Sequence, residues 1–297
     1  MRFDVYTPLV LSLLLSVVAP VIGGRVAPAL AARVLTSAAV LTAAATTWSL
    51  VLLVTALLGD APPVVREARE DGHRLADPVP VVIGIAAGVA LAVVARRVCR
   101  AVRAERCTRR ALQRLCAGQP ADTELIVAAS KVPQAFAIPG RPGRILVTSA
   151  MLSALEPPER RVLLAHERAH LAHRHGPLVT AATLAAAANP LLTPVRSAVV
   201  FLVERWADEQ AAAVVGDRRT AARALARAAL SAGRARPACP LNFTERAVTR
   251  RIAALQTSPP PRLWPAAAAV LALGALPALL AADATDDLLG LLSGVLT

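Results

Sequence analysis

The sequence predicts a mainly α-helical membrane protein, with about four transmembrane helices and an α+β domain that carries a small sheet. Hydrophobic residues make up 56% of the 297 residues and the mean hydropathy is +0.53, although only 3% of the residues are aromatic. Apolar segments long enough, or nearly so, to cross a hydrocarbon core of about 30 Å flank a more polar central region. In that central region, short β-like runs precede Ala- and Leu-rich helical stretches.

The candidate membrane spans are residues 5–23, 34–58, 79–95 and 264–282. They predict three domains: three transmembrane helices in 1–95, a central domain in 96–262, and a fourth transmembrane helix with a short outer tail in 263–297. Arginines 96, 97, 100, 103, 106, 109, 110 and 114 follow the third span, with Glu105 as the only acidic residue among them. Positively charged loops stay on the cytoplasmic side, so we expect a multi-pass protein of the cell membrane with a cytoplasmic central domain and both termini outside.

The net charge of +13 raises the question of a nucleic-acid partner. The basic residues are nearly all arginine, Lys131 being the only lysine, and the densest run directly follows a predicted span. Membrane topology and anionic lipid headgroups already explain such a run, and no aromatic residues interleave with it to stack on bases. We therefore expect a lipid bilayer as partner and no nucleic acid. A solvated amphipathic helix at the membrane surface explains the run equally well.

The central domain begins with three short strand-like segments, at residues 124–129, 134–138 and 145–148. The last two are separated by the Pro- and Gly-rich residues 139–143, which favour a turn. The sequence therefore predicts a β-hairpin just upstream of the most informative motif.

That motif is the HExxH pentapeptide that starts at His166 and ends at His170. In a helix, residues four apart lie one turn apart on one face, so both imidazoles can bind the same zinc ion while Glu167 lies beside its water. Glu156 to Glu159, with two prolines between the acidic residues, suits the first turn of this helix. We expect the helix to stop near Gly176 and Pro177.

A catalytic zinc ion needs a third protein ligand and keeps a fourth position for water. His173 lies seven residues after His166, a rise of about 10.5 Å, which is too far to share the ion. Gly176 stands where an extended HExxHxxGxxH pattern needs its last histidine. A carboxylate remains, and Glu204 in a second helical stretch is the predicted third ligand. Asp208, one turn later, can accept the second ring N–H of a ligand histidine. The alternative is a solvated acidic helix face.

Taken together, these segments resemble the membrane-bound gluzincin zinc metallopeptidases, which include the HtpX-like and CAAX-prenyl-protease group and the peptidase domain of the beta-lactam sensor-transducers BlaR and MecR. The matching residues are 145–152, Leu155 and 163–170, then Glu204 and Asp208 as an ExxxD motif, then Arg251, Ile252 and Leu255 as a closing helix. The resemblance covers roughly residues 120–256 and implies one zinc ion per chain. It also implies that residues Gln134, Ala135, Phe136 and Ala137 form an edge strand that binds peptide substrate. An ordinary hairpin that covers the zinc helix is equally compatible with the sequence.

Three features bear on the branch of the family. His175 matches a histidine that the HtpX-like group often has after HExxH, whereas the sensor-transducers are expected to have an acidic residue there. Asn189, Pro190 and Leu191 instead resemble a segment typical of the sensor-transducers. Only residues 283–297 follow the last apolar segment, so we expect no extracellular penicillin-binding domain. The sequence does not separate the two branches.

The apolar stretch 177–203 lies between the two halves of the predicted zinc site. One complete crossing would place His170 and Glu204 on opposite faces of the bilayer. The stretch must therefore return to its starting side, either as two packed helices bent at Asn189 and Pro190 or as a shallow re-entrant hairpin.

The predicted chemistry is metal-assisted hydrolysis of peptide bonds. Zinc on His166, His170 and Glu204 lowers the pKa of its water toward about 7, and Glu167 takes the proton and passes it to the leaving amine. Arg218, Arg219 and Arg223 are candidates to stabilise the oxyanion, although each is also an ordinary surface residue. We expect an endopeptidase that cleaves membrane-associated or cytoplasmic proteins. The alternatives are a signalling protease that cleaves a transcriptional repressor and a non-enzymatic protein with structural zinc, which usually has four protein ligands.

Overall fold

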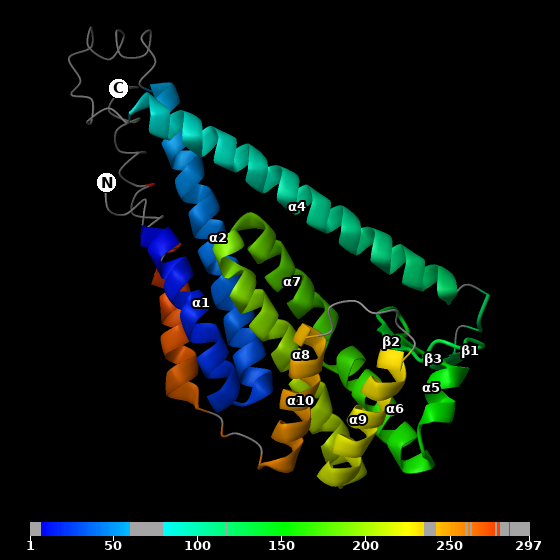
Figure 1. Cartoon of the computed structure of the whole chain (residues 1–297). Helices are drawn as coiled ribbons and strands as arrows, with labels where there is room; N and C mark the ends of the chain where they lie inside the picture. The colour runs from blue at the N-terminus through cyan, green and yellow to red at the C-terminus, as the bar shows by residue number, and fades with distance from the viewer. Residues whose placement is uncertain are drawn as a thin grey trace, which may run out of the picture.

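The computed structural model is mostly helical, with one small sheet at one end of the molecule (Figure 1). It describes residues 7–59, 80–116, 118–120, 122–234, 242–258, 261, 263–276, 278–279 and 285. Residues 60–79, between the second and third predicted spans, and nearly all of the outer tail lie outside the described residues.

Three described helices are long and apolar enough to cross a membrane: α1 (Thr7–Arg25), α2 (Pro28–Gly59) and α4 (Val81–Leu115). The apolar helix at the predicted fourth span, Trp264–Leu276, is shorter than these. The prediction of about four spans is therefore not confirmed. Helix α4 continues for 35 residues, well past the predicted end of its span at residue 95. The arginine run is thus the second half of the same straight helix (Figure 1).

The apolar stretch between the two motifs forms two packed helices, which is one of the two predicted alternatives. Helix α7 (His175–Ala188) ends at Asn189, a short 3-10 turn η1 (Pro190–Leu192) reverses the chain, and α8 (Thr193–Val215) returns. Both helices pack against α2, and α8 also packs against α1 (Figure 1). Their shared core contains the fully buried side chains Leu15, Leu35, Leu192, Val199 and Leu202.

Asn189 ties the tip of this helical pair to the first two helices. Its amide nitrogen donates to the hydroxyls of Ser12 on α1, at 2.7 Å, and Thr46 on α2, at 3.2 Å. Its amide oxygen accepts from the backbone N–H of Leu191 at 3.1 Å, which caps η1. A buried amide is costly unless it is hydrogen-bonded, so these three bonds fix where the α7–α8 turn sits between α1 and α2.

The predicted hairpin is present as β2 (Ala135–Ile138) antiparallel to β3 (Arg144–Thr148), and β1 (Leu125–Ala128) pairs in parallel with β3. The strand order β1-β3-β2 leaves β2 at an edge. Ile145 and Val147 of the central strand are fully buried and join a cluster with Met151 of α5 (Ser149–Ala154) and Leu155.

Helix α6 (Pro157–Ala172) carries the HExxH motif. Helix α9 (Arg218–Arg234) packs against α6 and α8, and α10 (Asn242–Gln256) packs against α8 and α9. The start of α6 follows the prediction: prolines occupy the first turn, and the Glu159 carboxylate accepts the backbone N–H of Glu156 at 3.0 Å.

The predicted end of α6 near Gly176 and Pro177 is wrong, because the helix ends at Ala172. Arg174 adopts the left-handed conformation, with φ 51° and ψ 49°, and the chain turns there into α7. Gly176 and Pro177 fall in the first turn of α7, where proline lacks only an N–H that a helix leaves unpaired anyway.

Candidate metal site

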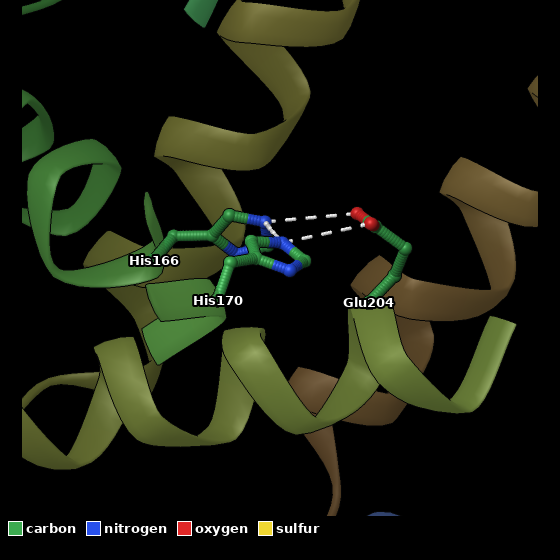
Figure 2. A group of neighbouring side chains, drawn as sticks. All are labelled: His166, His170 and Glu204. Atoms are coloured by element: carbon green, nitrogen blue, oxygen red, sulfur yellow. Dashed lines mark hydrogen bonds and ion pairs between the residues drawn. The ribbon is translucent and has the colours of Figure 1, made fainter. Parts of the chain in front are cut away.

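The two helices that carry the predicted ligands pack closely because their facing side chains are small. Ala165 of α6 lies in one buried cluster with Ala211 and Ala212 of α8, and Val162 and Leu255 complete the layer. Small residues allow helix axes to approach, so the side chains that point along this seam come within contact distance. The seam places Glu204 of α8 opposite the histidines of α6 (Figure 2). Asp208, one turn later on α8, lies 3.1 Å from His166.

His166, His170 and Glu204 converge on one point, and they form a group that could hold a metal ion in the described part of the chain. The two Nε2 atoms lie 3.1 Å apart, and each lies 3.6 Å from an oxygen of Glu204. Two ligand atoms bound to one tetrahedral zinc ion at about 2.0–2.1 Å are about 3.3 Å apart. The measured separations bracket that value, so the donor set fits zinc in both atom type and spacing.

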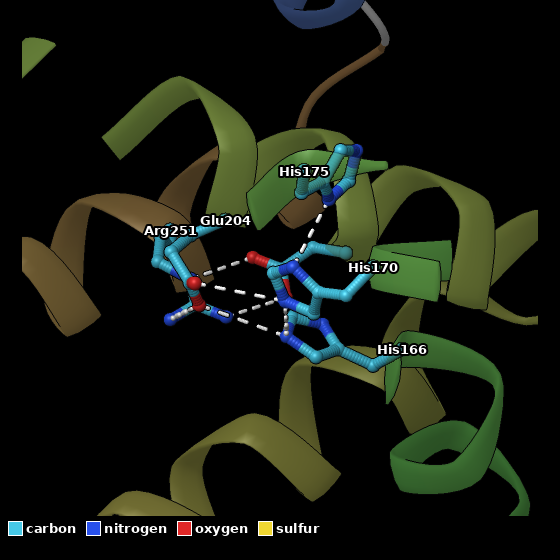
Figure 3. Close-up of polar contacts among 6 residues, drawn as sticks. His166, His170, His175, Glu204 and Arg251 are labelled. Carbon is cyan, nitrogen blue, oxygen red and sulfur yellow. Dashed lines mark hydrogen bonds and ion pairs between the residues drawn. The ribbon is translucent and has the colours of Figure 1, made fainter. Parts of the chain in front are cut away.

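A carboxylate lies behind His166, on the side away from Glu204. Its Nδ1 atom lies 3.1 Å from Oδ1 of Asp208. Asp208 is itself held by Arg251 of α10, whose Nε and Nη2 each lie 2.7 Å from a carboxylate oxygen. The third guanidinium nitrogen of Arg251 lies 3.0 Å from Glu204 (Figure 3). One arginine thus connects the residue behind His166 with the carboxylate at the metal position.

His170 is oriented differently. Its Nδ1 atom lies 3.0 Å from Nδ1 of His175, the first residue of α7 (Figure 3). His175 is 1% exposed, and its ring packs against Trp206 of α8 at 4.5 Å between centroids. The His173 ring also stacks on Trp206, at 4.6 Å between centroids, and the guanidinium of Arg33 from α2 lies 4.8 Å from the centroid of the Trp206 ring.

Glu167 lies on the same helix turn as His166 and is 8% exposed. Burial raises the pKa of its carboxyl group, while the backbone N–H of Ala137 on β2 donates to it and opposes the rise. A carboxyl group with a raised pKa is a better proton acceptor once ionised, which suits a general base.

The electrostatics of the cluster favour a cation at its centre. Burial lowers the pKa of His166, but the hydrogen bonds to Asp208 and Glu204 outweigh it and raise the pKa to about 10. Burial and the neighbouring His166 lower the pKa of His170 to about 4. The pKa of Glu204 lies well below its ordinary value, because its contacts with His166 and Arg251 outweigh burial. The proton on His166 is thus stabilised by two neighbouring carboxylates, and a metal ion would compete with that proton.

The free edge of β2 points toward this site. On β3, the backbone N–H of Ile145 donates to the carbonyl of Glu124, on the side of β1. Ala137 is the residue of β2 opposite Ile145, so its backbone groups face away from β3. The same alternation turns the backbone groups of Ala135 outward. The contact between Ala137 N–H and Glu167 agrees with this direction. Phe136 is exposed on the strand, and Gln134 bonds back to Thr148.

The three arginines predicted for the oxyanion have their described contacts elsewhere. Arg218 pairs with Glu209 and donates to the carbonyls of Ala254 and Leu255 at the end of α10. The backbone of Arg219 bonds to Asp217, and Arg223 donates to Thr220. The guanidinium that does reach the site belongs to Arg251. The sequence linked it to the site only through the resemblance, because nothing local marks it among the chain's many arginines.

Residues 101–196 match the model of peptidase family M48. The M48 match covers about a third of the chain, including α6 with both histidines and Glu167, and it ends before Glu204 and Asp208. M48 peptidases are zinc-dependent, so the match and the His166–His170–Glu204 cluster point to the same chemistry. The match indicates a peptidase. No curated protein and no solved structure matches the chain significantly.

Proposed function

We propose that the protein is an integral-membrane zinc metalloendopeptidase. The observation that carries the proposal is the convergence of two imidazoles and one carboxylate from separate helices at zinc-ligand spacing, with the buried carboxylate of Glu167 beside them. The M48 match over the same helix supports it independently. Only three protein ligands come together among the described residues, which suits a catalytic site better than a closed structural one.

His166, His170 and Glu204 would hold the ion, and Asp208 would hold the proton on Nδ1 of His166 so that Nε2 stays free to bind. Zinc in this place would supply a Lewis acid that polarises a peptide carbonyl and makes water more acidic. Glu167 would accept a proton from the attacking water and deliver it to the leaving amine. Arg251 keeps Glu204 and Asp208 charged and in position, because it pairs with both.

Substrate would bind by strand addition to β2. Ala135 turns both of its backbone groups to the free edge, and Ala137 turns its carbonyl there. The contact of the Ala137 N–H with Glu167 supports a position of that edge beside the site. An extended peptide paired there would pass in front of the ligands. Backbone pairing reads main chain rather than side chains, which suits a protease with broad sequence tolerance.

We further propose that the central domain, 96–262, lies on the cytoplasmic side and acts on membrane-associated or cytoplasmic proteins, in quality control or regulated proteolysis. The arginine half of α4, which follows an apolar half directly, supports this orientation. A role as a signalling protease that cleaves one transcriptional repressor has the same chemistry and is distinguished by its cleavage products.

The test is casein cleavage by the purified full chain in detergent micelles, with Glu167→Gln as the diagnostic variant. Removing a general base should lower the rate by about 10²–10⁴-fold. The zinc content should stay at that of the unsubstituted protein, because the ligands are unchanged. Glu124→Gln is the matched control, since Glu124 is an exposed partner of Arg168, and it should cut normally. Undiminished cleavage by Glu167→Gln would remove the mechanism. Comparing proteome-wide cleavage products with and without Glu167 separates broad from dedicated proteolysis.

A further inference from the structure

The two proposed histidine ligands are supported by different kinds of partner. Nδ1 of His166 faces the carboxylate of Asp208 at 3.1 Å, whereas Nδ1 of His170 faces the ring nitrogen of His175 at 3.0 Å. An ionised carboxylate can only accept a hydrogen bond from a ligand histidine, but a nitrogen of a neutral imidazole can either accept or donate one. The support of His170 therefore depends on which nitrogen of His175 carries the proton.

The two arrangements have opposite consequences for metal binding. If Nδ1 of His175 accepts, His170 carries its proton on Nδ1 and its Nε2, which faces His166 and Glu204, is free to bind a cation. If Nδ1 of His175 donates, the proton of His170 must sit on Nε2 and blocks that position. Metal binding therefore requires the tautomer of His175 that carries its proton on Nε2.

An unfavourable backbone conformation at Arg174 places His175 here. Positions 170 and 175 of an unbroken helix would point about 140° apart, so a continuous α6 could not bring these rings together. The left-handed turn at Arg174, a residue with a side chain, redirects the chain. Such a conformation is unfavourable for an L-residue other than glycine, because its Cβ comes close to the following carbonyl oxygen. Strained backbone of this kind persists where the surrounding structure requires it, and it often lies at functional sites.

The ring is also held with little freedom. His175 is 1% exposed and is packed by Trp206, which His173 and Arg33 stack in turn. Its Nε2 atom is buried with no hydrogen-bond partner among the described residues. An ordinary buried histidine uses both nitrogens, so packing alone does not explain this choice of residue. The described contacts leave one polar partner for the ring, which is the proposed ligand His170.

We propose that His175 is a positioning residue that sets the metal-binding tautomer and the ring orientation of His170. The inference rests on the proposed function, because it assigns a role toward the same ion. Through Trp206 and Arg33 the support extends to α2, so a membrane helix contributes to the orientation of one ligand while α10 secures the other.

The experiment compares three variants of the full chain in a Glu167→Gln background, which prevents self-cleavage. His175→Asn keeps an acceptor oxygen where Nδ1 stands, His175→Leu has the same shape as asparagine without an acceptor, and His175→Phe keeps a ring that can stack on Trp206. The zinc dissociation constant is measured by competition with a chromophoric chelator, and cobalt is substituted to record the visible absorption of the ligand field. Thermal unfolding checks that each variant is folded.

Losing the partner of a metal-bound histidine should weaken zinc binding by about 10–100-fold in the leucine and phenylalanine variants and alter the cobalt spectrum. The asparagine variant should stay within about threefold of the unsubstituted chain, since it restores the acceptor. Equal zinc affinity in all three variants, or equal weakening in all three, would overturn the proposal, because the acceptor would then not matter. If the chain with His175 intact binds no zinc, the proposed function itself fails, which is a distinct result.

Discussion

The pairing of Arg251 with Asp208 and Glu204 can be tested through its effect on the stability of the protein. The arginine is 13% exposed at the side chain and makes two 2.7 Å contacts with Asp208, which is 7% exposed. It makes a third contact, at 3.0 Å, with Glu204. Arg251→Met keeps much of the aliphatic volume and leaves two carboxylates without their cation. Removing one partner of a buried pair costs about 3–5 kcal/mol, because the other charge stays buried without compensation.

The magnitude lies toward the lower end of that range, about 3 kcal/mol, for two reasons. Asp208 keeps its contact with His166, and Glu204 is 34% exposed, so solvent screens part of its charge. Asp208→Asn should cost less than Arg251→Met, because the arginine then still pairs with Glu204. The double variant should be more stable than the sum of the two losses predicts, by about 1–3 kcal/mol, because the two residues act as one pair.

The assay is reversible unfolding in mixed detergent micelles, with the free energy of unfolding compared in chelator and in excess zinc. A bound cation compensates the same carboxylates, so the deficit of Arg251→Met should shrink with zinc. Arg168→Met is the matched control: its partner Glu124 is about half exposed, and the loss should stay below about 1 kcal/mol. If Arg251→Met lowers the free energy of unfolding by no more than that control does, the stabilising role of the Arg251 pairs is refuted.

Two further predictions concern the turn and the base. Arg174→Gly should raise the unfolding temperature, with a gain of up to about 1 kcal/mol, because relief of the left-handed strain exceeds the extra chain entropy, whereas Arg174→Val should lower it. A lower unfolding temperature for the glycine variant would contradict the strain argument. Activity requires ionised Glu167, and burial raises its pKa above the ordinary 4.5, so kcat/KM should fall as the pH drops through a value higher than that. Profiles measured across the acid range check this, and a midpoint at or below 4.5 would exclude Glu167 as the titrating base.

The features that the sequence predicted depend on interactions between residues that lie close together in the chain. Spacing along one helix predicted that His166 and His170 share a face and that Glu204 and Asp208 do too, and the structure brings the four side chains together. The strands were predicted within a residue or two, because alternation and turn residues are local signals. The end of α6 was predicted wrongly, since the left-handed turn occurs at an arginine, a residue type that carries no signal for it.

What the sequence by itself determined is therefore the set of candidate ligands and the helical and strand segments that carry it, because helical periodicity relates residues within a turn without reference to the rest of the chain. Only the tertiary structure decided what lies behind each ligand. Arg251 reaches Asp208 from 43 residues away, and His175 meets His170 because the chain turns at Arg174 and packs on Trp206. Contacts of this kind depend on how helices pack around a shared core, and packing is a property of the whole fold rather than of any segment.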